Sequence, residues 1–183
     1  MTFSKLHRGL FLDRDGVINI DVGHNSLVSN FNFMPNIFTL CQLAKKLDYK
    51  IIIVTNQSGI GRNLFSLDQY YALSDWMLSK FSENLIEIDL IMTSTLNPDF
   101  QSYSQFELFR RKPNPGLILD AIEILSLDPN ESWLIGNKLT DIQAGESAGV
   151  KNLVLLDTVE NDQVNFRTVP NLESASNLLM LEG

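Results

Sequence analysis

Two aspartates, Asp13 and Asp15, directly follow a short apolar run that ends at Leu12, and Gly16 comes next. Carboxylates in this spacing can converge on one hard cation if one side chain and the other residue's main-chain carbonyl turn the same way. They can also serve as a nucleophile beside a proton-transfer group. An ordinary Asp-Gly turn at a strand end explains the same residues, so three further segments must decide between these interpretations.

A second polar cluster follows the β-branched run at residues 51–54. Its hydroxyl and amide groups, which can donate to the oxygens of an anion, belong to Thr55, Asn56, Gln57 and Ser58. Gly59 and Gly61 then allow main-chain N–H groups to approach an anion closely. This composition is typical of a phosphate cradle, although it also suits a simple strand-to-helix turn.

The third and fourth segments complete the pattern. Arg110, Arg111 and Lys112 open a predicted amphipathic helix in an otherwise acidic chain. Cations at a helix N-terminus oppose the helix dipole, so they indicate an anionic partner, with a solvated basic turn as the alternative. Residues 133–141 again read as strand, glycine, polar cluster and helix. Polar residues thus follow each of these predicted strands at its carboxyl end.

The predicted elements bring these segments together. The predicted strands lie near residues 9–13, 50–55, 86–92, 132–136 and 152–156. The predicted helices lie at residues 36–47, 67–82 and 115–126, and residues 158–183 are expected to form a polar loop and a closing helix. This alternation is typical of a parallel sheet, whose strands end at one common edge. Residues 17–35 are too few for a cap domain, so we expect an open site.

The order and content of the four segments resemble the haloacid dehalogenase (HAD) superfamily of phosphohydrolases, and within it the branch of small heptose bisphosphate and histidinol phosphate phosphatases. The matching motifs are residues 11–19, 54–60, 111–116 and 136–141, and the resemblance covers roughly residues 8–157. Four motifs in order are far more specific than any one of them. The resemblance implies an α/β, three-layer Rossmann-like fold with a central parallel sheet and no large cap domain.

By that resemblance, Asp13 is the nucleophile that forms an aspartyl-phosphate, and Asp15 protonates the leaving alkoxide and then deprotonates the attacking water. Lys112 is the cation on the transferring phosphoryl group, and Mg²⁺ is the implied cofactor. The implied metal ligands are Asp13, Asp15 through its carbonyl, Asn137 and Asp141. The implied substrate contacts are Asp21, His24, Thr55, Asn56, Gln57, Ser58, Arg62, Arg111 and Lys138.

One departure from the family pattern concerns the metal. Where the family has Gly-Asp-Lys in its fourth motif, this chain has Gly136-Asn137-Lys138. An amide oxygen can still bind Mg²⁺, but it brings one negative charge fewer, so we expect weaker metal binding. Asp141 could compensate directly or through a water.

The other departure concerns residues 92–109. Many relatives bind a structural zinc here with three cysteines and a histidine, and this chain has none of them. Ser94, Leu96, Leu108 and Arg110 occupy the ligand positions, so no zinc is expected. The expected replacement is apolar packing by the aromatic residues Phe100, Tyr103, Phe106 and Phe109.

Composition agrees with a small enzyme. The chain has 183 residues, 44% of them hydrophobic, so we expect one HAD-like domain over residues 1–183. A net charge of −8 argues against nucleic-acid and anionic-membrane partners. Cys41 is the single cysteine, and with no export signal or apolar run of transmembrane length it favours a cytoplasmic protein. A monomer is expected.

The leading interpretation is a Mg²⁺-dependent phosphomonoesterase acting on a phosphorylated sugar, namely C7 of D-glycero-D-manno-heptose 1,7-bisphosphate, in carbohydrate metabolism leading to lipopolysaccharide. Histidinol phosphate is the alternative substrate, since the loop that distinguishes the two groups is altered here. From a different class, a phospho-ligand binding protein silenced by Asn137 remains an alternative.

Overall fold

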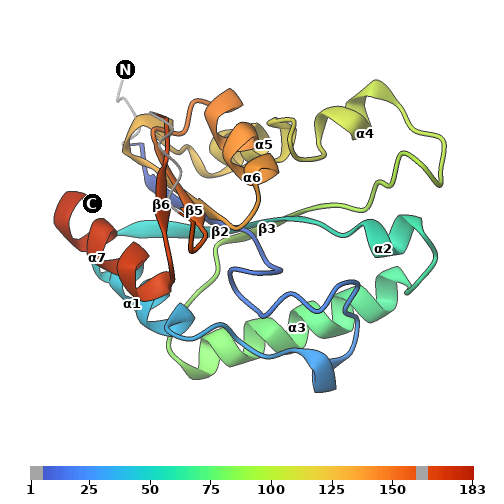
Figure 1. Cartoon of the computed structure of the whole chain (residues 1–183), viewed down its shortest axis with the longest axis horizontal. Helices are drawn as coiled ribbons and strands as arrows, with labels where there is room; N and C mark the ends of the chain where they lie inside the picture. Colours follow the sequence, from blue (N-terminus) through green and yellow to red (C-terminus); the bar gives the residue numbers. More distant parts are fainter. Residues whose placement is uncertain (1–5, 160–164) are drawn as a thin grey trace.

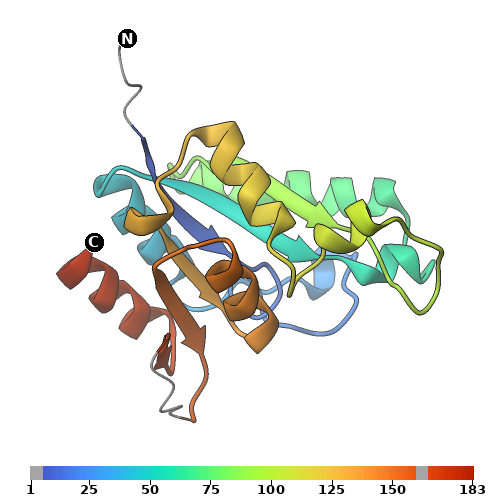
Figure 2. The ribbon, with the colours of Figure 1, turned by 90° about the horizontal axis from the view of Figure 1, so that it is seen from above.

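The computed structural model describes residues 6–159 and 165–183. Within them a six-stranded sheet has the order β3-β2-β1-β4-β5-β6 (Figures 1 and 2). The strands are β1 (Arg8–Leu12), β2 (Tyr49–Asn56), β3 (Leu90–Ser94), β4 (Trp133–Gly136), β5 (Asn152–Leu156) and β6 (Arg167–Val169). Every neighbouring pair is parallel, which confirms the predicted central parallel sheet.

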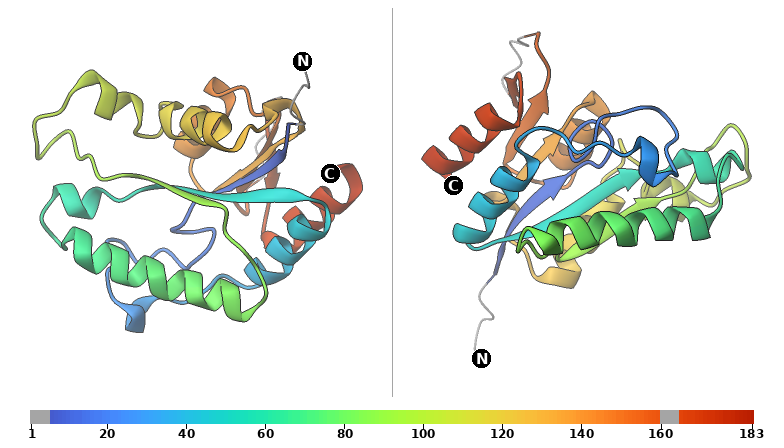
Figure 3. Two further views of the ribbon diagram at one scale, coloured as in Figure 1. Left: turned by 180° about the vertical axis from the view of Figure 1, so that it is seen from behind. Right: turned by 90° about the horizontal axis from the view of Figure 1, so that it is seen from below.

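Helices cover both faces of the sheet (Figures 1 and 3). One face of the sheet carries α1 (Ile37–Lys46), α3 (Leu67–Glu83) and α7 (Leu172–Glu182). The opposite face carries α5 (Gly116–Leu125) and α6 (Leu139–Ser147). The short elements are η1 (Val28–Asn30), α2 (Ser58–Gly61), α4 (Gln105–Phe109) and η2 (Pro129–Glu131). None of the helices described here is long and apolar enough to cross a membrane.

Side-chain alternation along the strands explains the three layers. On β1, Leu10 and Leu12 pack in the core beneath α1, α3 and α7, whereas Phe11 packs in the core beneath α5 and α6. Successive strand residues point to opposite faces, so an apolar run can fill two cores at once. Each fully buried Leu or Phe contributes about 1.5–3 kcal/mol. The predicted three-layer α/β fold is confirmed.

Two strand predictions need correction. Strand β3 was expected at residues 86–92 but begins at Leu90, opposite Ile52. The reason is Asp89, whose carboxylate accepts the N–H of Ile51 at 2.8 Å. That N–H is then not available for pairing with the main chain before Leu90. Strand β6 was expected to be loop; it has three residues, too few for a periodic signal. Residues 160–164 of the predicted polar loop lie outside the described residues.

The helix predictions agree closely with the structure. Helices α1, α3 and α5 begin and end within one residue of the ranges 36–47, 67–82 and 115–126, and α7 is the predicted closing helix. A capping box begins α3: the side chain of Ser66 accepts from the N–H of Gln69, whose side chain accepts from the N–H of Ser66.

The prediction that aromatic residues hold the segment 92–109 by apolar packing is wrong. Phe100 and Phe106 are 61% and 64% exposed, and Tyr103 and Phe109 are exposed as well. Hydrogen bonds and a cation–π contact fasten the segment instead, and an aromatic count does not reveal them. Ser104 caps α4 in a capping box with Glu107.

Two arginines also fasten this segment. Arg111 donates to the carbonyl of Leu96 at 2.7 Å. The guanidinium of Arg62 lies 4.8 Å from the ring centroid of Phe100. The segment is thus tied to α2 and to the turn before α5.

Candidate active site

A cavity of about 300 Å³ lies where the strands end. With the exceptions of Arg62 and Asn137, every residue predicted for the site lines it: Asp13, Asp15, Asp21, His24, Thr55, Asn56, Gln57, Ser58, Arg111, Lys112, Lys138 and Asp141. Gly23 and Thr140 line it too, and Thr140 was not among the predicted site residues. The sheet therefore gathers four sequence segments into one wall, as parallel topology requires.

A buried cluster of three charges forms the floor of this cavity. The Nζ atom of Lys112 lies 2.9 Å from Oδ1 of Asp13 and 2.6 Å from Oδ1 of Asp141. It also donates to the carbonyl of Val54 at 2.7 Å. The exposed fractions of Asp13, Lys112 and Asp141 are only 8%, 4% and 2%. Three acceptors therefore fix the position of the ammonium group.

Electrostatics adjust the proton affinities in this cluster. Burial raises the pKa of Asp13 to about 6, with the charge of Asp141 adding to the effect and Lys112 opposing it. Burial by itself would lower the pKa of Lys112, but Asp13 and Asp141 outweigh it, so this pKa lies above its ordinary value. At neutral pH an ionised carboxylate thus lies beside a charged ammonium group. A carboxylate in that state can attack phosphorus.

Asp15 lies on the cavity wall, with a side chain that is 15% exposed. Its two carboxylate oxygens accept hydrogen bonds from Arg14, Asn19 and Gln57. A carboxylate held this way has a fixed orientation, which suits proton transfer at one position.

Strand β2 contributes residues that orient the others. The side chain of Asn56 donates to the carbonyl of Lys112 at 2.9 Å and accepts its N–H at 3.2 Å. Its amide thus holds the main chain of Lys112, whereas the sequence suggested a direct substrate contact. The hydroxyl of Thr55 accepts from Gln57 at 2.8 Å, so its own proton can be donated into the cavity.

The loop after β1 closes one side of the cavity. Asp21 accepts the N–H of Gly23 at 2.9 Å, and its other oxygen lies 3.1 Å from Nζ of Lys138. Burial would raise the pKa of Asp21, but the hydrogen bonds from Gly23 and Lys138 lower it below its ordinary value. This ion pair joins the loop to the start of α6, and a phosphate would compete with Asp21 for Lys138.

Asn137 does not line the cavity but packs behind it. A Cβ on Gly16 would lie 2.1 Å from Nδ2 of Asn137, and Gly16 has a φ of +96°. The Oδ1 atom of Asn137 is buried without a hydrogen-bond partner among the described residues. Asp141 accepts the N–H groups of Asn137 and Lys138 at 3.2 and 3.0 Å and so shapes this turn. An orphaned buried oxygen fits a cation ligand.

The remaining predicted residue, Arg62, lies outside the cavity lining, with its guanidinium over Phe100. Across residues 6–159 and 165–183, no group of three or more His, Cys, Asp or Glu side chains is arranged to hold a metal. A cation at this site would therefore use amide and main-chain oxygens besides carboxylate.

Comparisons with known proteins agree with this geometry. A HAD-hydrolase-like family model matches residues 109–171. A D-glycero-alpha-D-manno-heptose-1,7-bisphosphate 7-phosphatase from Burkholderia mallei is 44% identical over 155 residues, which cover 82% of this chain and 80% of that protein. The chain belongs to the HAD-like phosphatase family. This HAD-like phosphatase is accordingly a phosphoric monoester hydrolase, and the resemblance of its four motifs is confirmed.

Another relative of this HAD-like phosphatase is named for the other anomer. The D-glycero-beta-D-manno-heptose-1,7-bisphosphate 7-phosphatase from Pasteurella multocida is 37% identical over 153 residues, which cover 84% of this chain and 83% of that protein.

Solved structures share the fold of this HAD-like phosphatase. A HAD-like phosphatase from Mesorhizobium loti superposes with a TM-score of 0.83 at 29% identity, covering 98% of this chain and 88% of that one. The D,D-heptose 1,7-bisphosphate phosphatase from B. bronchiseptica, complexed with magnesium and phosphate, gives 0.80 at 24% identity, with coverage of 96% and 99%.

Proposed function

We propose that this HAD-like phosphatase hydrolyses the C7 phosphate ester of D-glycero-D-manno-heptose 1,7-bisphosphate through an aspartyl-phosphate on Asp13. The observation that carries the proposal is the buried contact between Asp13 and Lys112 on the cavity floor, at 2.9 Å. The names of the relatives from Burkholderia mallei and Pasteurella multocida support the choice of sugar.

In the first step, a carboxylate oxygen of Asp13 bonds to phosphorus as the bond from phosphorus to the C7 oxygen breaks. The leaving oxygen keeps the bonding electron pair and takes a proton from Asp15. Lys112 balances the charge of the phosphoryl oxygens, and Thr55 donates a hydrogen bond to one of them.

In the second step, Asp15 is a carboxylate and accepts a proton from water. The water oxygen bonds to phosphorus while the bond to Asp13 breaks, which restores the Asp13 carboxylate and releases inorganic phosphate. One group thus gives a proton and takes one back, and the enzyme returns to its starting state.

The donor set fits Mg²⁺. The ligands would be the carboxylate of Asp13, the main-chain carbonyl of Asp15 and the orphaned Oδ1 of Asn137. When bound, Mg²⁺ supplies positive charge that offsets repulsion between the carboxylate and the phosphate dianion. We assign Asp141 to anchoring Lys112 and the turn of Asn137, because its two oxygens are used in those contacts, in place of the metal ligation that the sequence suggested.

Cationic residues beyond the cavity floor suit the rest of a bisphosphate. Arg111 and Lys138 line the cavity together with His24. Lys112 is committed to the phosphate that reacts, so the phosphate on C1 would meet Arg111 or Lys138, where fork-shaped or point-charge recognition is available.

A second candidate rests on Asn137: a phospho-ligand binding protein whose metal affinity is too low for turnover. One experiment separates the candidates. Phosphate release is measured with Mg²⁺ and with EDTA, using both anomers of heptose 1,7-bisphosphate, histidinol phosphate and fructose 1,6-bisphosphate. Asp13→Asn serves as the blank and Asn137→Asp as the metal-site variant.

We expect Mg²⁺-dependent release that is fastest from a heptose bisphosphate and absent in Asp13→Asn. Faster release from histidinol phosphate would overturn the sugar assignment and leave the mechanism in place. Release by Asn137→Asp alone would favour the binding protein.

A further inference from the structure

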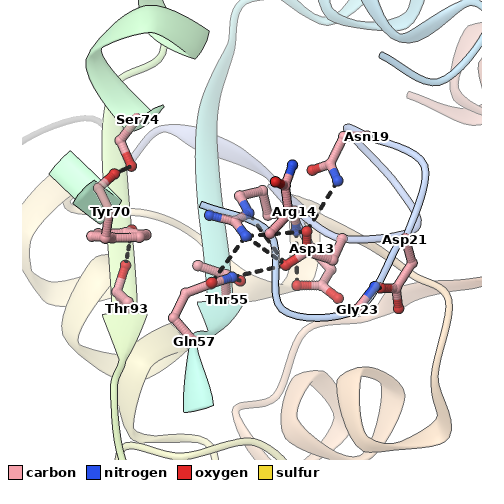
Figure 4. A network of polar contacts seen from close by, with 12 residues as sticks. Asp13, Arg14, Asn19, Asp21, Gly23, Thr55, Gln57, Tyr70, Ser74 and Thr93 are labelled. Carbon is pink, nitrogen blue, oxygen red and sulfur yellow. Dashed lines mark hydrogen bonds and ion pairs between the residues drawn. The ribbon is translucent and has the colours of Figure 1, made fainter. Parts of the chain in front are cut away.

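Arg14 has no part in the phosphoryl transfer described above, yet it lies between the two aspartates and is only 2% exposed. It leaves the end of β1 on the side of α3, where its guanidinium lies 5.9 Å from the ring centroid of Tyr70 (Figure 4). Arg14 does not line the cavity. Burying a guanidinium is costly, so its partners deserve an explanation.

Arg14 donates hydrogen bonds to both carboxylate oxygens of Asp15. Its Nη2 atom lies 3.1 Å from Oδ1 and 2.9 Å from Oδ2 of Asp15, and its Nε lies 3.2 Å from Oδ2. Its third nitrogen, Nη1, is buried with no hydrogen-bond partner among the described residues. The guanidinium is thus oriented toward Asp15 even though a donor is left unpaired, which costs free energy.

Gln57, which follows β2, forms hydrogen bonds with both members of this pair. Its Oε1 accepts from Nη2 of Arg14 at 2.9 Å, and its Nε2 donates to Oδ2 of Asp15 at 2.8 Å and to Thr55 at 2.8 Å. On the other side, Asn19 donates to Oδ1 of Asp15 at 3.0 Å. The plane of the Asp15 carboxylate is therefore fixed by donors from three separate positions in the chain.

The back of the network rests on α3 and β3. The hydroxyl of Tyr70, whose ring faces Arg14, lies 2.5 Å from Oγ1 of Thr93. The carbonyl of Tyr70 accepts from the hydroxyl of Ser74 at 2.8 Å (Figure 4). The aromatic wall behind Arg14 is thus held on two sides.

We propose that Arg14, with Gln57 as its bridge, is a positioning residue that holds Asp15 in the orientation needed to protonate the leaving oxygen. The role rests on the proposed function, in which Asp15 is the acid. Arg14 touches neither the substrate nor the phosphoryl group; it acts through Asp15. The alternative is that Arg14 only stabilises the fold.

The leaving group distinguishes these two roles. An alkoxide needs a proton as it departs, whereas a nitrophenolate departs without one. The second step, in which Asp15 takes a proton from water, is common to both substrates, so only the first step distinguishes them. Loss of a positioning residue should therefore lower kcat for the sugar phosphate and spare the release of p-nitrophenolate in the first turnover. Loss of fold stability would lower both rates together through the amount of active enzyme.

The experiment compares kcat and KM for heptose 1,7-bisphosphate with the rate of p-nitrophenolate release in the first turnover of p-nitrophenyl phosphate, both with Mg²⁺. It uses the parent chain, Arg14→Ala, Arg14→Lys and Asp15→Asn. Arg8→Ala is the matched control: Arg8 lies at the other end of β1, with its guanidinium 4.4 Å from the ring centroid of Tyr49. Circular dichroism checks folding, and Gln57→Leu tests the bridge if Arg14→Ala does not fold.

We expect Arg14→Ala to lower kcat for the sugar phosphate about 10–100-fold with KM nearly unchanged, and to alter the rate of p-nitrophenolate release in the first turnover by less than about threefold. Added guanidinium ion should restore part of the activity of Arg14→Ala, whereas Arg14→Lys, which lacks the fork, should remain impaired. Gln57→Leu should show the same leaving-group pattern.

Equal losses of sugar-phosphate kcat and of first-turnover p-nitrophenolate release, or no loss of either, would overturn the positioning role. Parent activity and an inactive Asp13→Asn would then leave the proposed function standing. A parent chain that hydrolyses neither substrate, or an Asp15→Asn variant without a leaving-group pattern, would overturn the proposed mechanism and the positioning role with it.

Discussion

Two clusters of charged side chains lie at opposite edges of the sheet and have opposite compositions. At the carboxyl edge, the active-site cluster places one ammonium group, that of Lys112, between the carboxylates of Asp13 and Asp141. The amino-edge cluster places one carboxylate between two ammonium groups: Nζ of Lys45 lies 2.6 Å and Nζ of Lys50 lies 2.9 Å from the oxygens of Asp89.

The two clusters treat a buried carboxylate differently. Burial raises the pKa of Asp13 to about 6, because Lys112 is shared with Asp141 and compensates only in part. Burial would also raise the pKa of Asp89, but the hydrogen bonds from Lys45, Lys50 and the N–H of Ile51 lower it. A charge that the protein leaves undercompensated indicates a functional site, and a fully compensated charge indicates a structural one.

The largest expected effect is on catalysis. Asp13→Asn should reduce kcat by at least about 10⁴-fold, because the amide is not a nucleophile toward phosphorus. Asp89→Asn should leave kcat within about twofold, because Asp89 lies at the far edge of the sheet. Phosphate release with Mg²⁺ measures both. Comparable losses in the two variants would show that the comparison of the clusters does not separate function from structure.

Removal of the lysine should affect both activity and stability. Lys112→Met should lower kcat by about 10²–10³-fold, because the phosphoryl oxygens lose their fixed cation. It should also lower the free energy of unfolding by about 3 kcal/mol, because two buried carboxylates lose their partner. Lys50→Met, at a half-exposed position of the amino-edge cluster, should cost less than about 1 kcal/mol. Urea unfolding in EDTA provides the stability measurement; equal costs at the two positions would contradict the burial argument.

The same substitution should move stability in opposite directions at the two aspartates. In metal-free protein at pH 7, Asp13→Asn should raise the free energy of unfolding by about 1–3 kcal/mol, because each unit of raised pKa corresponds to about 1.4 kcal/mol that ionisation removes. Asp89→Asn should lower it by about 1–2 kcal/mol, because Lys45 and Lys50 lose a charged partner but still reach solvent.

The pH dependence gives the sign of each effect. The folded state binds the proton of Asp13 more tightly than the unfolded state does. The amount by which Asp13→Asn raises the free energy of unfolding should therefore grow as pH rises from about 4 to about 6. The pKa of Asp89 is lowered in the folded state. The amount by which Asp89→Asn lowers the free energy of unfolding should therefore be largest above about pH 4 and should decrease as pH falls through that lowered pKa. Urea unfolding between pH 3 and pH 8 in EDTA tests both trends, and parallel curves would contradict them.

The smallest expected effect concerns Asn137. Asn137→Asp should tighten Mg²⁺ binding about tenfold, since a carboxylate replaces an amide at a ligand position. Calorimetric titration of Mg²⁺ into the parent and the variant measures the change. Asn130→Asp, on the exposed η2 turn, is the control and should leave the affinity unchanged. Unchanged affinity in Asn137→Asp would remove residue 137 from the metal site.

The sequence predicted the features that depend on periodicity and strand ends. Short apolar and β-branched runs indicated the strands, and parallel strands bring Asp13 and Thr55, which lie at the carboxyl ends of β1 and β2, to one edge. The late start of β3 was not predictable, because it depends on a contact between Asp89 and Ile51 on a neighbouring strand. The pairing of the Asn56 amide with the main chain of Lys112 was not predictable either, because it joins residues 56 positions apart in the chain.

Arg14 shows most clearly what a linear reading omits. Beside two aspartates, it reads as simple local charge compensation. Its partner Gln57 and the ring of Tyr70 come from other elements, so its constraint on Asp15 exists only after folding. Likewise, the sequence does not show that Phe100 is exposed with its ring beside the guanidinium of Arg62, because Arg62 comes from a different segment of the chain.

The tight fit between Gly16 and Asn137 has an evolutionary consequence. Any side chain at residue 16 would displace the Asn137 amide, so glycine is required there as long as residue 137 has that shape. Aspartate has the same shape, and its codons differ from those of asparagine by a single base. A lineage that keeps Gly16 can therefore gain or lose one negative charge behind its nucleophile by one point mutation, with no compensating change elsewhere in the gene.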